Sequence, residues 1–120
     1  MCIRDRPYSE GVGDRDSLHL SDEDVTLIEK VKRSKLPIVV ILISGSPMII
    51  NEVLDESDAF LAAWLPGTEG LGISDVIFGD FDFTGKLSMT WPKSMKQIPI
   101  NYGDSSYDPL FKLGFGLSYE

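Results

Sequence analysis

The stretch DAFLAAWLPGTEG (58–70) predicts a strand, a tight turn and the beginning of a helix. Phe60–Leu65 is a nearly continuous apolar run, which is typical of a strand covered on both faces. Pro66-Gly67 ends it, because proline has no N–H to donate and glycine permits unusual backbone angles. Thr68 is then expected to cap a helix, with Glu69 in the first turn, where the helix dipole favours an acid. Strand–turn–helix units of this kind build α/β sheets.

A helix and another strand are expected before this stretch. Ser21 is well placed as a helix N-cap because three acids follow it. Leu36–Ile43 is apolar and rich in β-branched residues, which predicts a central parallel strand. Ser44-Gly45-Ser46 turns the chain, and Pro47 is expected at the first helical position of an amphipathic helix that reaches Leu54.

The remaining sequence predicts the end of a helix, a short strand and an irregular tail. Gly79 is placed as the C-cap of the helix that follows Thr68. Lys86–Trp91 alternates polar and apolar residues, which favours a less buried or edge strand. The tail is expected to be ordered and pinned by its aromatic residues: Tyr102, Tyr107, Phe111, Phe115 and Tyr119. The fold class is therefore α/β, a layered helix-sheet-helix sandwich with a mostly parallel sheet.

Composition limits the classes of function. The chain has 120 residues, enough for one domain with a real core. Its net charge of −8 disfavours nucleic acid as a partner, because phosphates would be repelled. The single Cys2 excludes an internal disulfide and a cysteine-cluster metal site. No apolar run approaches the roughly 20 residues that span a bilayer, so we expect no membrane partner.

Several candidate binding sites have simpler explanations. Ser44–Pro47 lies where a strand runs into an expected helix N-terminus, which could hold the phosphate of a nucleotide. The glycine-rich phosphate-binding motifs are missing, so an ordinary turn is favoured. His19, the only histidine, is favoured as a surface or half-buried loop residue, because no partner is near it in sequence. A basic cluster is interpreted as a solvated helix end: Lys30, Lys32, Arg33 and Lys35.

Carboxylates supply two further candidates. Converging acids could bind a hard cation, and those considered are Asp80, Asp82, Asp104 and Asp108. Solvated turn residues are the better interpretation, because Lys86 falls where further ligands would be needed. Glu10 lies in a glycine-bracketed loop beside Tyr8, a position common to site residues and to ordinary surface glutamates.

Ordered motifs resemble the second domain of family 3 glycoside hydrolases. PYSEGVGD (7–14) resembles that family's PY-x-E-x-x-GD loop, and LISGSP (42–47) resembles LISGRP. AAWLPGTEG (62–70) resembles the same motif of the family. Downstream blocks complete the pattern: FGDF (78–81), TGKL (84–87), TWP (90–92), YDPLF (107–111) and GFGLSY (114–119). The match is nearest to the β-glucosidase and exo-β-glucanase branch.

The resemblance implies a retaining hydrolase in which Glu10 is the general acid/base. The nucleophile aspartate is expected in a (β/α)8 barrel outside these residues, and no metal or cofactor is implied. The implied partners are a β-glucoside or β-glucan oligosaccharide and that barrel, in a periplasmic or extracellular compartment. The alternative is a non-catalytic carbohydrate-contact or packing module, inactive alone.

The sequence departs from the family pattern at two places, and the first affects the expected boundaries. Arg4-Asp5 stands where the family usually has Gly-Glu, and Ser46 stands where it usually has Arg. From the first departure, together with Cys2, we expect residues 1–5 to be a non-native leader and residues 6–120 to be the C-terminal part of the second domain. The sheet would then be incomplete on its N-terminal side. The strand over Ile38–Ile43 would have an unpaired or poorly covered edge that favours association.

Overall fold

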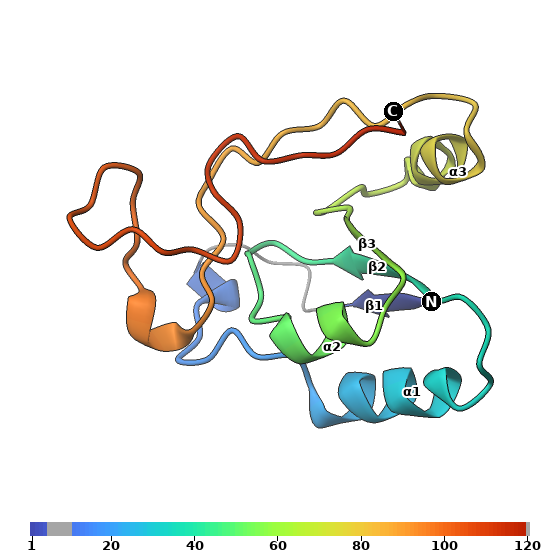
Figure 1. The fold of residues 1–120 in the computed structure, drawn as a ribbon, viewed down its shortest axis with the longest axis horizontal. Helices are drawn as coiled ribbons and strands as arrows, with labels where there is room; N and C mark the ends of the chain where they lie inside the picture. The colour runs from blue at the N-terminus through green and yellow to red at the C-terminus, as the bar shows by residue number, and fades with distance from the viewer. Residues whose placement is uncertain (5–10, 120) are drawn as a thin grey trace. The chain divides into compact units, whose positions relative to one another are not determined.

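The computed structural model describes residues 1–4 and 11–119, and the chain divides into two compact units, Met1–Leu65 and Pro66–Glu120. Figure 1 shows the elements in chain order. The first unit contains β1 (Cys2–Arg4), η1 (Gly11–Gly13), α1 (Asp22–Lys32), β2 (Val39–Ile43), α2 (Asn51–Asp55) and β3 (Ala59–Ala62). The second contains α3 (Gly70–Phe78) and η2 (Met95–Gln97).

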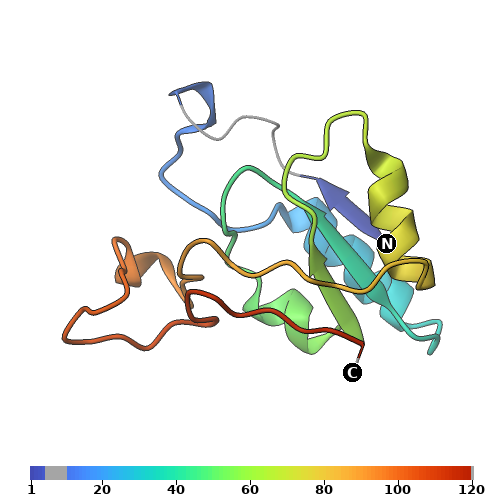
Figure 2. The same cartoon turned by 90° about the horizontal axis from the view of Figure 1, so that it is seen from above.

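The strands form a parallel three-stranded sheet in the order β1-β2-β3 (Figures 1 and 2). Leu42 of β2 pairs with Ile3 on one side and with Ala62 on the other. The predicted α/β class and the central position of this strand are confirmed. The expectation of an unpaired edge along Ile38–Ile43 is wrong, because β1 occupies that edge. Among the described residues, the open edges belong to β1 and β3 instead.

β1 was not expected from the sequence. Ile3 is 1% exposed, while its neighbours Cys2 and Arg4 are exposed, as in a strand with one buried face. Three residues are too few to carry a readable pattern, so a partner strand decides their conformation. The pairing does not test whether residues 1–5 are native, and that remains a prediction.

The core of the first unit lies between the sheet and two helices. Val40 and Leu42 are fully buried, and the residues between and beside them on β2 are only partly covered or exposed. Figure 1 shows α1 and α2 on one side of the sheet. They and their flanking segments contribute the other buried apolar side chains: Ile28, Ile38, Met48, Ile50 and Val53. β3 is half-buried with Ala59 exposed, so the prediction of cover on both faces is wrong for this edge strand.

Capping decides where α1 begins, and a backbone contact shifts α2. Ser21 caps α1 as predicted, since its Oγ accepts a hydrogen bond from the Asp24 N–H at 3.1 Å. Pro47 does not begin α2, which starts at Asn51. The Ile49 N–H donates to the Leu18 carbonyl at 2.8 Å, and this bridge holds the preceding residues out of a helix. In the described part of the chain, no helix is long and apolar enough to cross a membrane.

α3 begins later than predicted and ends where predicted. Thr68 does not cap it, because its hydroxyl donates to Glu69 Oε1 at 3.1 Å. Glu69 occupies the cap position, and its side chain makes no capping hydrogen bond to the helix. Gly79 is the C-cap, with φ +85 and its N–H donating to the Asp75 carbonyl. Left-handed backbone at this position is accessible to glycine at little cost.

The tail of the second unit is ordered by aromatic contacts, as expected. The predicted strand over Lys86–Trp91 is reduced to a bridge between Trp91 and Phe111 and to two bonds at Leu87. Phe111 stacks on Phe115 at 4.6 Å and meets Trp91 edge to face at 6.4 Å. Rings rather than a continuous ladder hold this segment, because its many prolines and glycines interrupt pairing.

Candidate active site

The predicted catalytic residue, Glu10, lies outside the described residues. Its flanking elements are described: β1 ends at Arg4 and η1 begins at Gly11. Arg4 pairs with Ile43, the last residue of β2, so both parallel strands end at the same edge of the sheet. Ligands of open α/β sheets bind at the carboxyl ends of the strands, and the segment containing Glu10 begins at this edge.

The carboxyl ends of β2 and β3 are tied together by a buried serine. Ser44 is 1% exposed, and its N–H donates to the Trp64 carbonyl at 3.1 Å. Its hydroxyl donates to the Ser46 carbonyl at 2.8 Å. Trp64 has φ +53, a left-handed conformation that costs a non-glycine residue about 1–2 kcal/mol. Strained backbone of this kind concentrates at functional sites, and the sequence gives no sign of it beyond the following Pro66-Gly67.

The nucleotide-site alternative at Ser44–Pro47 lacks its geometric basis. Ser44 directs its hydroxyl to a backbone carbonyl, so that donor is used within the turn. The strand does not run directly into a helix, because α2 begins only at Asn51 and is five residues long. The favoured interpretation, an ordinary turn, describes this segment. Ser46 contributes its backbone carbonyl to this turn.

Three of the four candidate metal-binding aspartates have partners other than a metal. Asp82 Oδ1 accepts from the N–H groups of Phe83 at 2.6 Å and Tyr119 at 2.9 Å. Asp104 Oδ2 accepts from the Asn101 N–H at 2.7 Å, and Asp108 pairs with Lys93 at 2.6 Å. Asp80 is exposed beyond the end of α3. Within the described residues, no three acids, histidines or cysteines gather to hold an ion.

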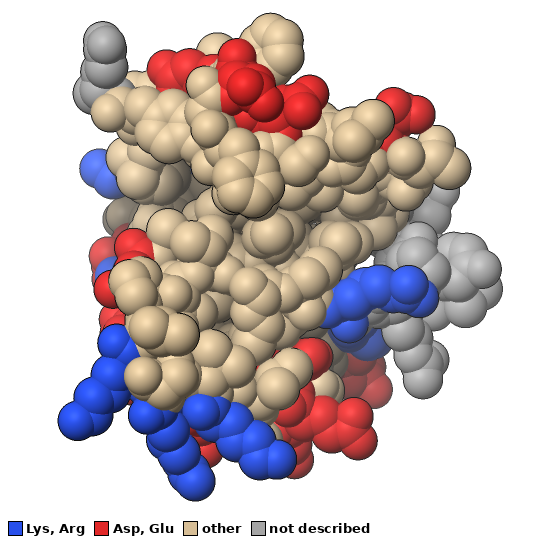
Figure 3. Space-filling model, turned by 90° about the vertical axis from the view of Figure 1, so that its right-hand side faces the viewer, with Lys and Arg blue, Asp and Glu red and all other residues tan. Residues whose placement is uncertain are grey.

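The basic cluster and His19 make contacts that are ordinary for surface residues. Lys32 Nζ lies 2.9 Å from Glu56 Oε2, with both side chains about half exposed, so the pair adds little stability. Lys and Arg side chains gather along the lower part of the face shown in Figure 3. His19 is an exposed loop residue bridged through its backbone to Ile49. Neither feature forms a binding site by itself.

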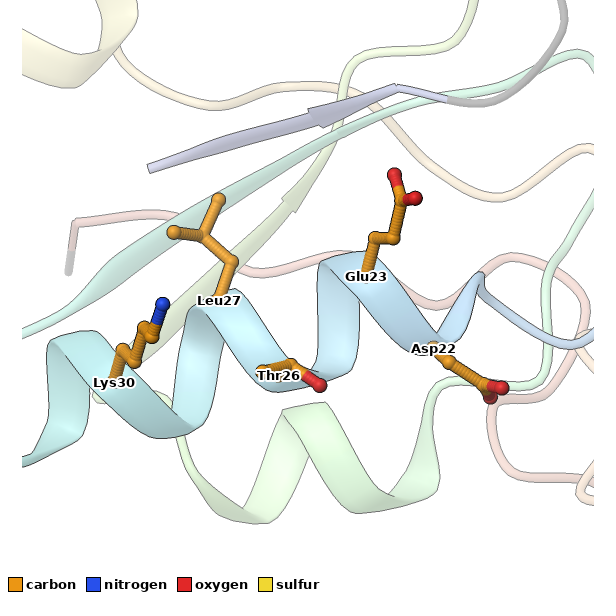
Figure 4. Close-up of a pocket in the computed structure, with 5 residues that line it drawn as sticks. All are labelled: Asp22, Glu23, Thr26, Leu27 and Lys30. Atoms are coloured by element: carbon orange, nitrogen blue, oxygen red, sulfur yellow. The ribbon is translucent and has the colours of Figure 1, made fainter.

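One surface hollow was not anticipated from the sequence. It has a volume of about 450 Å³, and its lining residues all belong to α1: Asp22, Glu23, Thr26, Leu27 and Lys30. Figure 4 shows that Asp22 and Glu23 point away from each other. The polar side chains do not converge on a common point, so the hollow lacks the arrangement of a ligand site.

The fold defines the structural class: an α/β domain with a parallel sheet and flanking helices. The family model "Glycosyl hydrolase family 3 C-terminal domain" matches residues 1–119. The chain belongs to glycoside hydrolase family 3, and it corresponds to the C-terminal domain of that family.

Relatives agree with this assignment. The crystal structure of an exo-1,3/1,4-β-glucanase from a Pseudoalteromonas species is 44% identical with a TM-score of 0.91, covering 99% of this chain and 16% of that one. A β-glucosidase from Listeria innocua, solved in complex with glucose, is 28% identical with a TM-score of 0.91, covering 99% and 20%. A β-xylosidase from Formosa agariphila is 35% identical over 122 residues, covering 89% of this chain and 17% of its own length.

The chain thus spans only 16% to 20% of the length of these relatives. The family and the fold implied by the sequence motifs are confirmed. The relatives include enzymes named for glucosides and for xylosides, so the family match leaves the sugar open. The role of Glu10 remains a prediction.

Proposed function

We propose that the chain is part of a retaining β-glucosidase or exo-β-glucanase and supplies its general acid/base, Glu10. The proposal rests chiefly on the loop PYSEGVGD (7–14), which follows a strand ending at the carboxyl edge of the sheet. Glucose rather than xylose is chosen because the motifs resemble the β-glucosidase and exo-β-glucanase branch most nearly, and an exo-1,3/1,4-β-glucanase shares 44% identity with the chain.

The proposed reaction needs two carboxyl groups about 5 Å apart across the scissile bond. An aspartate of a barrel outside these 120 residues attacks the anomeric carbon, while Glu10 protonates the departing glycosidic oxygen. Glu10, now a carboxylate, then removes a proton from the water that releases the sugar from the aspartate. The configuration at the anomeric carbon is retained because it is inverted twice.

The described residues would serve this chemistry by holding the edge from which the Glu10 loop departs. The bond from the Ser44 N–H to the Trp64 carbonyl and the pairing of Arg4 with Ile43 fix the strand ends relative to one another. A fixed edge reduces the positional freedom of the loop attached to it. Catalytic groups gain most when they are held near the reactive geometry.

The second candidate is a non-catalytic carbohydrate-contact or packing module. It is favoured for the isolated chain by a chemical argument: Glu10 alone cannot serve as both acid and nucleophile. On this account the purified chain hydrolyses no aryl β-glucoside above background, and this holds under either candidate. The two candidates differ only when the chain is joined to a barrel.

A chimeric enzyme distinguishes the two candidate functions. Residues 7–120 replace the matching segment of a full-length family 3 β-glucosidase, and the product is followed by proton NMR during hydrolysis of an aryl β-glucoside and an aryl β-xyloside. We expect β-glucose as the first product and a preference for the glucoside. A folded chimera whose activity is unchanged by Glu10→Gln would favour the non-catalytic module, and α-glucose as the first product would exclude retention.

A further inference from the structure

In the second unit, Tyr102 carries an exposed ring whose backbone turn and ring contact are both well ordered. Tyr102 is 75% exposed and lies in the loop that follows η2, drawn orange to red in Figure 1. A lone exposed aromatic residue needs no explanation. Tyr102, however, is held at its backbone and at its ring, and its supporting residue is itself held in place.

The backbone of Tyr102 is fixed by a closed turn. The Asp104 N–H donates to the Asn101 carbonyl at 3.1 Å, and the Asp104 carboxylate accepts from the Asn101 N–H at 2.7 Å. Gly103 has φ +97, so the turn carries its left-handed residue at the third position, as in a type II turn. Tyr102 occupies the second position of the turn.

The ring of Tyr102 is supported by Tyr107. Their ring centroids are 5.8 Å apart at an interplanar angle of 86°, an edge-to-face contact that leaves much of Tyr102 open to solvent. The Tyr107 hydroxyl accepts from the Leu113 N–H at 3.1 Å and shares a hydrogen bond with Thr90 Oγ1 at 3.0 Å. An aromatic surface held in this way loses little conformational entropy when a ligand covers it.

The surroundings of the ring suit a sugar. Exposed polar residues flank it on the same loop: Asn101, Ser105 and Ser106. Their amide and hydroxyl groups can exchange hydrogen bonds with sugar hydroxyls. The C–H groups of a β-glucose ring lie on its faces, where they are attracted to the negative face of an aromatic ring.

We propose that Tyr102 is a stacking platform for one glucose unit of a β-linked gluco-oligosaccharide. The choice of ligand rests on the proposed function, whereas the platform itself rests on the turn and the ring contacts. The site binds a sugar unit without taking part in bond cleavage. It therefore affects the affinity for oligosaccharides and leaves the chemistry at the scissile bond unchanged.

The first test is a titration of the ¹⁵N-labelled chain with cellotetraose and with laminaritetraose at millimolar concentrations, followed by NMR. We expect saturable shifts of the Gly103 and Asp104 amide signals. Tyr102→Ala should bind about five-fold more weakly or worse, and Tyr102→Phe should bind as the wild type does. Phe78, which is 82% exposed on α3, offers a matched control, and Phe78→Ala should bind normally. Equal binding by the wild type and Tyr102→Ala, or shifts centred elsewhere, would overturn the proposal.

The chimera distinguishes failure of this site from failure of the proposed function. Tyr102→Ala should raise KM for the tetraose and leave kcat and the hydrolysis of a small aryl glucoside unchanged. An active chimera with an unchanged tetraose KM would refute the platform alone. An inactive chimera whose isolated segment still binds tetraose through Tyr102 would refute the proposed function alone.

Discussion

At the scale of single residues, Asp58 shows how one side chain joins two strands. Its carboxylate Oδ2 accepts from the Ile38 N–H at 2.7 Å, just before β2. Its own N–H donates to the Ile38 carbonyl at 2.9 Å, just before β3. Ile38 is buried, so removal of the Asp58 carboxylate would leave the Ile38 N–H without an acceptor and with little access to water.

Removing that acceptor should destabilise the chain. We expect Asp58→Ala to lower the free energy of unfolding by about 1–2 kcal/mol, while Asp58→Asn keeps an acceptor oxygen and loses less. Asp55→Ala serves as the control, because Asp55 is an exposed acid at the end of α2. Urea unfolding followed by circular dichroism measures the difference. Equal losses for Asp58→Ala and Asp55→Ala would show that the Ile38 contact contributes nothing.

At the scale of elements, two glycines near α3 give a matched comparison. Gly79 ends the helix at φ +85, whereas Gly72 lies within it, and a Cβ at either position would meet no atom within 4 Å. The two positions therefore have the same room for a Cβ, and they differ in backbone conformation. Gly79→Ala should cost about 1 kcal/mol, and Gly72→Ala should be stabilising by a similar amount.

Thermal unfolding of the two variants measures this contrast directly. The signs of the change in Tm should be opposite, because alanine is unfavourable in left-handed backbone and favourable inside a helix. A lowered Tm for both variants would mean that side-chain crowding, rather than backbone conformation, controls these positions.

The same elements show what a sequence pattern can predict. The apolar run of β2, the Ser21 cap and the Gly79 cap depend on neighbours in sequence, and all were predicted. Pro47 and Thr68 were assigned wrongly because contacts with distant or competing groups, the Leu18 carbonyl and the Glu69 side chain, changed the local preference. The three-residue β1 depends on β2 for its conformation, so its own sequence could not indicate it.

In the candidate active site and at Tyr102, too, local features could be predicted from the sequence and contacts between distant residues could not. The series of motifs between residues 7 and 119 indicated the family, because each motif is local in sequence. The left-handed backbone of Trp64 accompanies a hydrogen bond to Ser44, which is distant in sequence. The turn at Tyr102 is closed locally, but Tyr107, which supports the Tyr102 ring, bonds to the distant Thr90. Propensity at a single position carries no record of such bonds.

At the scale of the whole chain, exposed apolar surface should cause self-association. α3 has no buried residue, and Leu71 and Phe78 are largely exposed. The outer edges of β1 and β3 have no partner strand among the described residues. We expect concentration-dependent association in sedimentation velocity, reduced in the Leu71→Lys, Phe78→Lys double variant.

Exposed Cys2 requires a control for disulfide-linked dimers, so the measurement is repeated with Cys2→Ser. Lysine at both helix positions adds charge to the apolar face without changing the strand edges. A monodisperse monomer for the parent chain at all concentrations would contradict the expectation. Association that is unchanged by the double variant would assign it to the strand edges instead of α3.

Glu10 is proposed as the general acid/base, and this claim is tested by a leaving-group series in the chimera. The contribution of an acid grows with the basicity of the departing oxygen, so Glu10→Ala should slow glucosides with poor leaving groups far more than activated aryl glucosides. Azide should partly restore turnover of the activated substrates, since it replaces the water that Glu10 would activate. Glu69→Ala is the matched control and should show neither effect. A uniform loss across the series for Glu10→Ala, or a steeper loss for Glu69→Ala, would contradict the claim.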